Sequence, residues 1–170
     1  MYSLNVPVPG EVKRVAMDLR AALADFEQFR DELSMVAKRL PIDDPAAFPA
    51  IHERTLSVLR GTVPFEVRVN GIEVFEEPTT GPAPVIYFAV ESPGLARLHD
   101  RLVEEFDPVP EIEDEAYVPH ITLARGGSVS QERLEELRSL EVEPIPWTVD
   151  RLVIWDPRRQ LPAGEVRLPA

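Results

Sequence analysis

The spacing of apolar and polar residues changes repeatedly between a strand-like and a helix-like period along the first half of the chain. Residues 2–8 alternate with a period of two and predict a strand, and residues 12–26 place apolar side chains every three or four positions, which predicts a helix. Residues 33–40 predict a second strand, and residues 48–59 a second helix. Residues 65–75 alternate again and predict a third strand. The first half is therefore predicted to have the order β-α-β-α-β.

The second half repeats this order. Residues 85–91 predict a strand, and Ser92 is a good N-cap for a helix whose apolar stripe runs to Phe106. Residues 117–125 predict the next strand, and a second helix is expected to begin at Ser128. Apolar alternation near the C-terminal end predicts one long strand and one short strand.

Two copies of one plan in a chain of 170 residues predict an α+β fold with internal pseudo-symmetry. We expect a single domain over residues 1–170, because a chain of this length buries one sizeable core. Within it, lobe-like repeats cover about residues 1–78 and 84–170 and are joined by a linker at 76–84. The two halves are expected to pack through antiparallel sheets and to leave a central cleft between them.

The net charge of −12 is the strongest anomaly of the composition. Of the 18 Lys and Arg residues only Lys13 and Lys38 are lysine, so the cations are almost all arginine. An acidic, lysine-poor surface suits concentrated salt, because screening removes much of its self-repulsion. We therefore hypothesise a halophilic source. The same charge disfavours an extended basic face for nucleic acid, so any RNA contact must be local.

The composition also excludes several kinds of chemistry. The chain has no cysteine, which rules out disulfides, thiolate metal sites and cysteine nucleophiles. Histidines and carboxylates show none of the spacings typical of a metal site, so no metal and no cofactor is implied. No apolar run is long enough to span a membrane, and the N-terminus lacks the basic and apolar regions of a signal peptide. We expect a cytoplasmic monomer.

One strand carries a candidate chemical pair. In YVPHITLAR, the period of two places His120 and Thr122 on one face and Ile121 and Leu123 on the other. An imidazole beside a hydroxyl can transfer a proton and hold a phosphate oxygen at the same time. A His-x-Thr pair alone also fits a half-buried structural histidine whose hydrogen bonds are satisfied by its neighbours.

The surroundings of this pair favour the chemical interpretation. PHITLAR, on a strand that follows a helix in the second half of the chain, resembles the second His-x-Thr motif of the two-histidine (2H) phosphoesterase superfamily. This superfamily includes the 2'-5' RNA ligases and the RNA 2',3'-cyclic phosphodiesterases. YSLNVPVP, VIYFAVE, PFEVRVNGIEVFEEP and the closing strands also resemble its ordered elements, so the resemblance covers essentially the whole chain.

The resemblance implies a bilobal fold in which two His-x-Thr motifs, one in each lobe, face each other across the cleft. One histidine would activate the attacking water or hydroxyl, and the other would protonate the leaving oxygen, while the hydroxyls would hold the phosphate. His120 and Thr122 would be the catalytic residues of the second motif. The implied partner is RNA or a nucleotide with a terminal or cyclic phosphate, with no metal and no membrane.

The first motif lacks its histidine. Aligning the two halves so that Ser34 corresponds to Thr122 places Glu32 in the histidine position, and a shift of one residue places Leu33 there. Neither side chain is equivalent to an imidazole, so Glu32, Leu33 and Ser34 are interpreted as a degenerate first motif. A carboxylate at Glu32 could still accept a proton from water, but beside a phosphate it would need a cation to offset its charge.

The other histidines are interpreted as structural. His52 and His99 lie on predicted helices, and each is followed two residues later by an arginine rather than by a hydroxyl residue. The residues near His99 include several charges, which indicates a solvated helix face. His52 could lie along the apolar stripe of its helix.

The candidate substrate-binding residues are cations near the ends of the two motif strands, together with one hydroxyl and one aromatic side chain. Ser34 could hold a phosphate oxygen. Lys38, Arg39 and Arg125 could bind phosphate, and ordinary solvation of a strand end explains them equally well. Tyr117 could stack on a base, as aromatic side chains do in single-stranded RNA recognition, or could belong to the core.

Three hypotheses for the function follow. The first is a 2'-5' RNA ligase-like or 2',3'-cyclic phosphodiesterase-like enzyme that acts through His120 and Thr122. The second is a catalytically impaired module that still binds a nucleotide or an RNA end but has lost the first motif. The third is a structural protein whose cleft is closed by Leu33 and Met35. The sequence favours the first two about equally.

Overall fold

The computed structural model describes residues 1–41 and 44–169. Its strands are β1 (Tyr2–Val6), β2 (Gln28–Phe29), β3 (Met35–Leu40), β4 (Phe65–Phe75), β5 (Val85–Glu91), β6 (His120–Arg125), β7 (Ile145–Val149), β8 (Arg151–Asp156) and β9 (Leu161–Arg167). Its helices are α1 (Gly10–Leu19), α2 (Phe48–Leu59), α3 (Pro93–Glu105) and α4 (Gln131–Arg138), with short 3₁₀ helices at Arg20–Leu23, Pro45–Ala47 and Asp114–Ala116. No helix within the described ranges is both long and apolar enough to cross a membrane.

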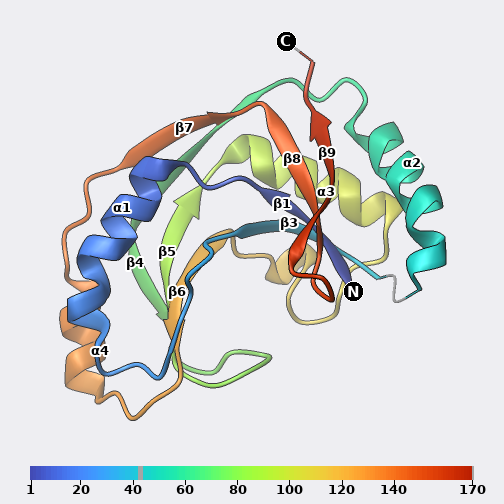
Figure 1. Cartoon of the computed structure of the whole chain (residues 1–170). Helices are drawn as coiled ribbons and strands as arrows, with labels where there is room; N and C mark the ends of the chain where they lie inside the picture. Colours follow the sequence, from blue (N-terminus) through green and yellow to red (C-terminus); the bar gives the residue numbers. More distant parts are fainter. Residues whose placement is uncertain (42–43, 170) are drawn as a thin grey trace.

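The strands form two antiparallel sheets, in the orders β3-β1-β8-β9 and β2-β6-β5-β4-β7. Figure 1 shows α1 and α4 at the left, α2 at the right and α3 across the middle of the molecule. The helix α3 contacts both β3 and β4, so it packs against a strand of each sheet. The expected α+β fold with two antiparallel sheets is confirmed.

Four strands of one sheet correspond to four strands of the other, and each sheet contains strands from both halves of the chain. The strand β4 precedes the linker at 76–84 and lies in the sheet with β5, whereas β8 lies beside β1. Along the sheets, β3, β1, β8 and β9 then correspond to β6, β5, β4 and β7. Because of this exchange the sheets share one core, in which Leu4 of one sheet and Phe88 of the other are both 0% exposed.

The helix starts in the second half agree only in part with the sequence pattern. Ser92 Oγ accepts a hydrogen bond from the backbone N–H of Leu95 at 3.1 Å, and Phe106 closes a buried apolar stripe, as predicted for α3. The cap of α4 is Ser130 and not Ser128. The glycine pair that follows β6 has positive φ and extends the turn, so the helix begins two residues later than predicted.

Candidate functional site

The strands β3 and β6 occupy equivalent positions and share an irregularity. The register of β6 against β5 skips Leu123, and the register of β3 against β1 skips Ala37. In both strands the residue after the skipped one is also buried, so the two burial patterns coincide. A bulge of this kind turns two neighbouring side chains toward the same side of the sheet. The shared bulge therefore gives a residue-by-residue correspondence between the strands.

Counted from the bulge, Val36 corresponds to Thr122 and Ser34 corresponds to His120. The alignment from sequence, which pairs Ser34 with Thr122 and Glu32 with the histidine, is displaced by two residues. The alignment from sequence pairs Ser34 with Thr122 because both carry a hydroxyl group. The alignment from the bulge instead rests on the backbone pairing of β3 and β6 with their neighbouring strands. Glu32 and Ser34 are exposed and precede β3, so the expected degenerate motif lies before the strand.

His120 is half-buried at the start of β6, beside two aromatic rings. The rings of Phe75 and Tyr87 approach the imidazole in edge-type contacts, with centroids 5.2 and 5.3 Å away. The Nδ1 atom lies 2.7 Å from the carbonyl oxygen of Val118. Because a carbonyl oxygen only accepts hydrogen bonds, Nδ1 carries the proton and Nε2 keeps its lone pair. The imidazole is therefore held in the tautomer that accepts a proton through Nε2.

The surroundings of His120 favour its neutral form. Burial lowers the pKa of this histidine, because the charged imidazolium loses solvation. The hydrogen bond to Val118 raises the pKa, and the positive charges of Arg39 and Arg125 lower it. The net direction of the pKa is downward from the ordinary value of 6.5, so the side chain is an unprotonated base at neutral pH.

A cavity of ≈ 280 Å³ brings His120 together with several of the expected binding residues. Arg39 and Arg125 line it, and Tyr117 and Val36 form part of its wall. Its remaining lining residues are Phe75, Glu77, Pro78, Thr79, Thr80, Val85, Glu111, Ile112, Ala116 and Val118. The cavity thus lies between the sheets, because β3 belongs to one sheet and β6 to the other.

Thr122 pairs with Tyr87 on β5 and lies on the same face of β6 as His120. Its side chain is half-buried, and it is not one of the residues that line the cavity. Within the described ranges no hydrogen bond to its hydroxyl is found, so this hydroxyl is available at the margin of the site. The exposed Ser34 also lies outside the cavity lining.

Lys38 is a structural residue and not a substrate ligand, which corrects the prediction from sequence. Its side chain is 0% exposed, and its Nζ lies 2.6 Å from Glu113 Oε2. Nζ also donates to the backbone carbonyls of Arg39, at 2.6 Å, and of Asp107, at 3.1 Å, so the ammonium group is fully hydrogen-bonded. Simple alternation along β3 would place this side chain in the cleft, but the bulge at Ala37 turns it inward.

His99 is buried, so the expected solvated helix face is wrong. Its side chain is 1% exposed, and Nδ1 lies 2.7 Å from the carbonyl oxygen of Ala37. Nε2 accepts a hydrogen bond from the backbone N–H of Asp114 at 3.1 Å, so both ring nitrogens are occupied within the fold. His52 is half-buried and stacks on Phe48, with ring centroids 5.8 Å apart.

Tyr117 covers the outer edge of β3. Its hydroxyl donates to the carbonyl oxygen of Val36 at 2.9 Å, and its ring stacks on His99 with centroids 3.7 Å apart. Burial raises the pKa of this hydroxyl, so it remains a donor at neutral pH. Glu113 accepts a hydrogen bond from the backbone N–H of Arg39 at 2.6 Å. These side chains satisfy the backbone of an edge strand and make Tyr117 a fixed wall of the cavity.

Arg39 and Arg125 bring positive charge to the cavity, and neither has a carboxylate partner among the described residues. Arg125 Nη1 donates to the carbonyl oxygen of Thr80 at 3.3 Å. Its Nε is buried and has no hydrogen-bond partner in the described part of the chain. A Cβ on Gly81 would collide with the Arg125 guanidinium, so glycine at this position lets the arginine pack against the linker.

The linker at 76–84 does more than connect the repeats, because residues 77–80 line the cavity. The available signal in the sequence is a long loop rich in proline and glycine, and loops held on a rigid scaffold often carry binding residues. Val36 is one of several further lining residues that the sequence does not indicate. An apolar side chain in a strand gives no chemical signal.

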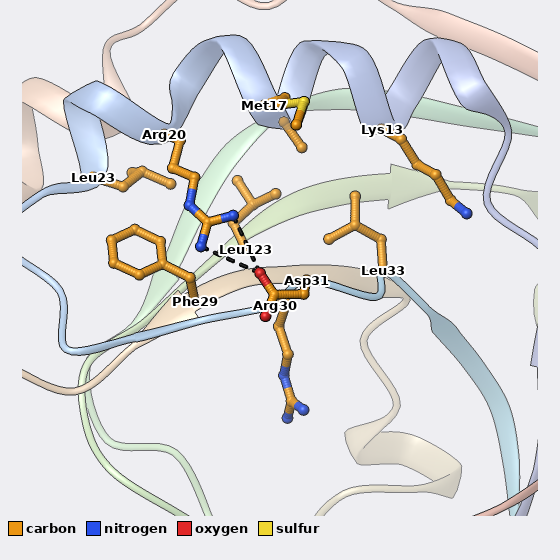
Figure 2. Close-up of a pocket in the computed structure, with 10 residues that line it drawn as sticks. Lys13, Met17, Arg20, Leu23, Phe29, Arg30, Asp31, Leu33 and Leu123 are labelled. Atoms are coloured by element: carbon orange, nitrogen blue, oxygen red, sulfur yellow. Dashed lines mark hydrogen bonds and ion pairs between the residues drawn. The ribbon is translucent and has the colours of Figure 1, made fainter. Parts of the chain in front are cut away.

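A second cavity, of ≈ 240 Å³, lies between α1 and the segment that joins β2 to β3. Figure 2 shows the ion pair of Arg20 and Asp31 at this cavity, with an N–O distance of 3.2 Å. Leu33 and Leu123 line it, so it lies on the face of β6 opposite to His120. In the part of the chain that the structure describes, no group of three or more His, Cys, Asp or Glu residues is placed to hold a metal ion.

The chain matches a protein-family model over most of its length. The family model described as the 2'-5' RNA ligase superfamily matches residues 36–161. This range begins at the second residue of β3 and includes β6 and the linker. Comparison with curated proteins gives no match.

Several solved structures share the fold. TT0787 of Thermus thermophilus is 20% identical with a TM-score of 0.68, covering 98% of this chain and 97% of that one. E. coli LigT complexed with 3'-AMP is 16% identical with a TM-score of 0.68, covering 99% of this chain and 98% of that one. Kluyveromyces marxianus Usb1 is 14% identical with a TM-score of 0.61, covering 99% of this chain and 97% of that one.

Proposed function

This chain belongs to the 2'-5' RNA ligase superfamily, and from that premise we propose that its cavity binds the terminal or 2',3'-cyclic phosphate of an RNA or nucleotide. His120 is the group that transfers a proton in this site, and Thr122 holds a phosphate oxygen at its margin. The structures of LigT with 3'-AMP and of Usb1 with uridine monophosphate support a nucleotide as the ligand class.

One observation carries the proposal: a neutral imidazole with a free Nε2 shares a cavity with Arg39 and Arg125, which have no carboxylate partners among the described residues. Glu77 and Glu111 line the same cavity, but among the described residues neither forms an ion pair with these arginines. Guanidinium groups left without one favour a bound anion, and their planar donors match phosphate oxygens. Such a site holds a phosphate next to a base.

The chemistry that His120 can supply is general base catalysis. As water attacks the phosphorus of a cyclic phosphate, Nε2 takes a proton from it and one P–O bond to the ribose breaks. In-line displacement places the leaving oxygen on the far side of the phosphorus, beyond the reach of His120. Solvent then supplies the proton for that oxygen, and the imidazolium later releases its own proton to solvent.

A second candidate function is binding without turnover. It is favoured by Ser34 and Val36, which occupy the positions equivalent to His120 and Thr122 and carry no group that titrates near neutral pH. Loss of one general acid typically lowers a rate by roughly 10²–10⁴-fold. Slow turnover or pure binding is therefore the expected range of behaviour.

Two measurements on one set of variants test these functions. Turnover of a 2',3'-cyclic nucleotide that disappears in His120→Ala supports the enzyme, whereas equal turnover in that variant excludes the role of His120. Calorimetric titration with 3'-AMP that weakens in Arg125→Ala, but not in the exposed control Arg97→Ala on α3, supports the binding site. Absence of both turnover and binding would leave only the structural hypothesis.

A further inference from the structure

Arg30 extends the face of the sheet on which His120 lies. It follows β2, and its backbone N–H donates to the carbonyl oxygen of Leu123 at 3.0 Å. The preceding residue, Phe29, pairs with Ala124 and lines the cavity beneath α1. Because side chains alternate along an extended segment, Arg30 points to the opposite face. Arg30 is also one of the residues that line this second cavity, but Figure 2 shows its guanidinium directed away from α1.

The charge of Arg30 reaches the cavity at His120. Gln28 pairs with Arg125 across β2 and β6, so Arg30, two residues after Gln28, lies on the same face as Arg125. Burial lowers the pKa of Arg125, and the positive charge of Arg30 lowers it further. The neighbouring Asp31 does not neutralise Arg30, because it pairs with Arg20. Arg30 has no ion pair or side-chain hydrogen bond among the described residues.

Arg30, Arg39 and Arg125 therefore form an arginine cluster along the cleft. Arg39 lies on β3 and Arg125 at the end of β6, while Arg30 lies across β6 from β5. Three like charges without carboxylate partners repel one another in the free protein. Glu77 and Glu111 also line the cavity with Arg39 and Arg125, whereas Arg30 lies outside its lining. A terminal phosphate in the cavity therefore leaves Arg30 without an anionic partner, which a second phosphate can supply.

We propose that Arg30 binds a second phosphate, the backbone phosphodiester next to the terminal phosphate, so that the ligand is the end of a single-stranded oligonucleotide rather than a mononucleotide. This inference rests on the proposed function, because it assumes that the terminal phosphate occupies the cavity at His120. It adds Arg30, which lies outside the lining of that cavity, to the binding site. It also requires a ligand with at least two phosphate groups, such as a 3'-phosphorylated dinucleotide. The single-stranded form follows from the need for a terminal phosphate to enter the cavity.

The test compares two ligands that differ by one phosphodiester. The probes are 3'-AMP and an adenosine dinucleotide that ends in a 3'-phosphate, titrated calorimetrically into the full chain and its variants Arg30→Ala, Arg30→Lys and Arg97→Ala. We expect the dinucleotide to bind the unmodified chain more tightly. Arg30→Ala should weaken the dinucleotide about tenfold and change the affinity for 3'-AMP by less than about twofold. Arg30→Lys should recover part of this loss, and Arg97→Ala should behave as the unmodified chain.

The salt dependence gives an independent readout. For single strands the slope of log K against log salt changes by about 0.7 for each phosphate contact, so Arg30→Ala should reduce the slope by about that amount for the dinucleotide only. Equal weakening of both ligands, or weakening of neither, would overturn the inference and leave the proposed function intact. Failure of both ligands to bind the unmodified chain would overturn the two together.

Discussion

The state of a single imidazole decides what the cavity can do. The carbonyl oxygen of Val118 fixes the proton on Nδ1, and burial among aromatic rings disfavours the cation, so His120 presents a basic Nε2. A bound phosphate changes this balance, because a nearby negative charge favours the imidazolium. The same residue is thus a base before the reaction and a hydrogen-bond donor to phosphate when protonated.

The pKa of His120 gives the first prediction. In the free protein the imidazole should titrate below 6.5, and saturation with 3'-AMP should move the midpoint upward. The measurement is a histidine titration by NMR, with the resonance assigned by its loss in His120→Ala. Any turnover should rise with pH through the lowered pKa, because the neutral form is the base. A free-protein midpoint above 6.5 would contradict the described environment.

Restoring the missing pair gives the second prediction. If the bulge defines the correspondence, Ser34→His with Val36→Thr rebuilds a His-x-Thr motif opposite His120. Turnover of a 2',3'-cyclic nucleotide should then rise at least about tenfold, because a general acid becomes available for the leaving oxygen. Ser34 is exposed and Val36 half-buried, so both changes should be tolerated.

The matched control places the same residue types two positions earlier, as Glu32→His with Ser34→Thr. These positions lie two residues before those that the bulge aligns with His120 and Thr122, so this pair should leave turnover unchanged. A gain from the control pair, or an equal gain from both pairs, would show that the correspondence drawn from the bulge is incorrect.

At the scale of elements, the sequence pattern predicts what depends on local spacing. The apolar stripe and Ser92 cap of α3 are predicted correctly, because both arise within a few residues of chain. The bulge of β3 is not predicted, since it exists only in the pairing with β1. For this reason alternation wrongly places Lys38 in the cleft, and for a similar reason it misses the exchange of β4 and β8 between the sheets. His120 is identifiable because its motif is local.

The buried pair of Lys38 and Glu113 gives an element-scale prediction. Glu113 holds the segment before β6 against the edge of β3 through Lys38 and two backbone N–H groups. Glu113→Ala leaves a buried ammonium unpaired and should lower the free energy of unfolding by about 3–5 kcal/mol. Lys38→Met with Glu113→Leu should cost less than the sum of the single changes, because no charge remains buried. Urea unfolding measures both.

A surface ion pair is the control for this cycle. Arg151 and Glu165 lie 3.4 Å apart with side chains 50% and 40% exposed, and Arg151→Ala should cost less than about 1 kcal/mol. If Glu113→Ala lowers the free energy of unfolding by as little as Arg151→Ala does, the segment before β6 does not depend on the buried pair.

At the scale of the whole molecule, charge affects the stability of the fold and the binding of phosphate in different ways. The net charge of −12 destabilises the compact chain through self-repulsion, and the arginine cluster attracts phosphate against that background. Salt screens both interactions, with a Debye length that falls from about 30 Å at 0.01 M to about 10 Å at 0.1 M. Stability and binding should therefore respond to salt in opposite directions.

The last prediction follows from this opposition. As potassium chloride rises from about 0.01 M to 0.5 M, the free energy of unfolding should increase, because screening relieves repulsion among the acidic side chains. Over the same range the affinity for a 3'-phosphorylated dinucleotide should fall, since each arginine–phosphate contact releases counterions. Chloride is the suitable anion, because sulfate would strengthen apolar burial and obscure the effect of screening. Full stability at the lowest salt concentration would contradict the hypothesis of a salt-adapted surface, whereas an affinity that does not change with salt would contradict phosphate binding by the arginine cluster.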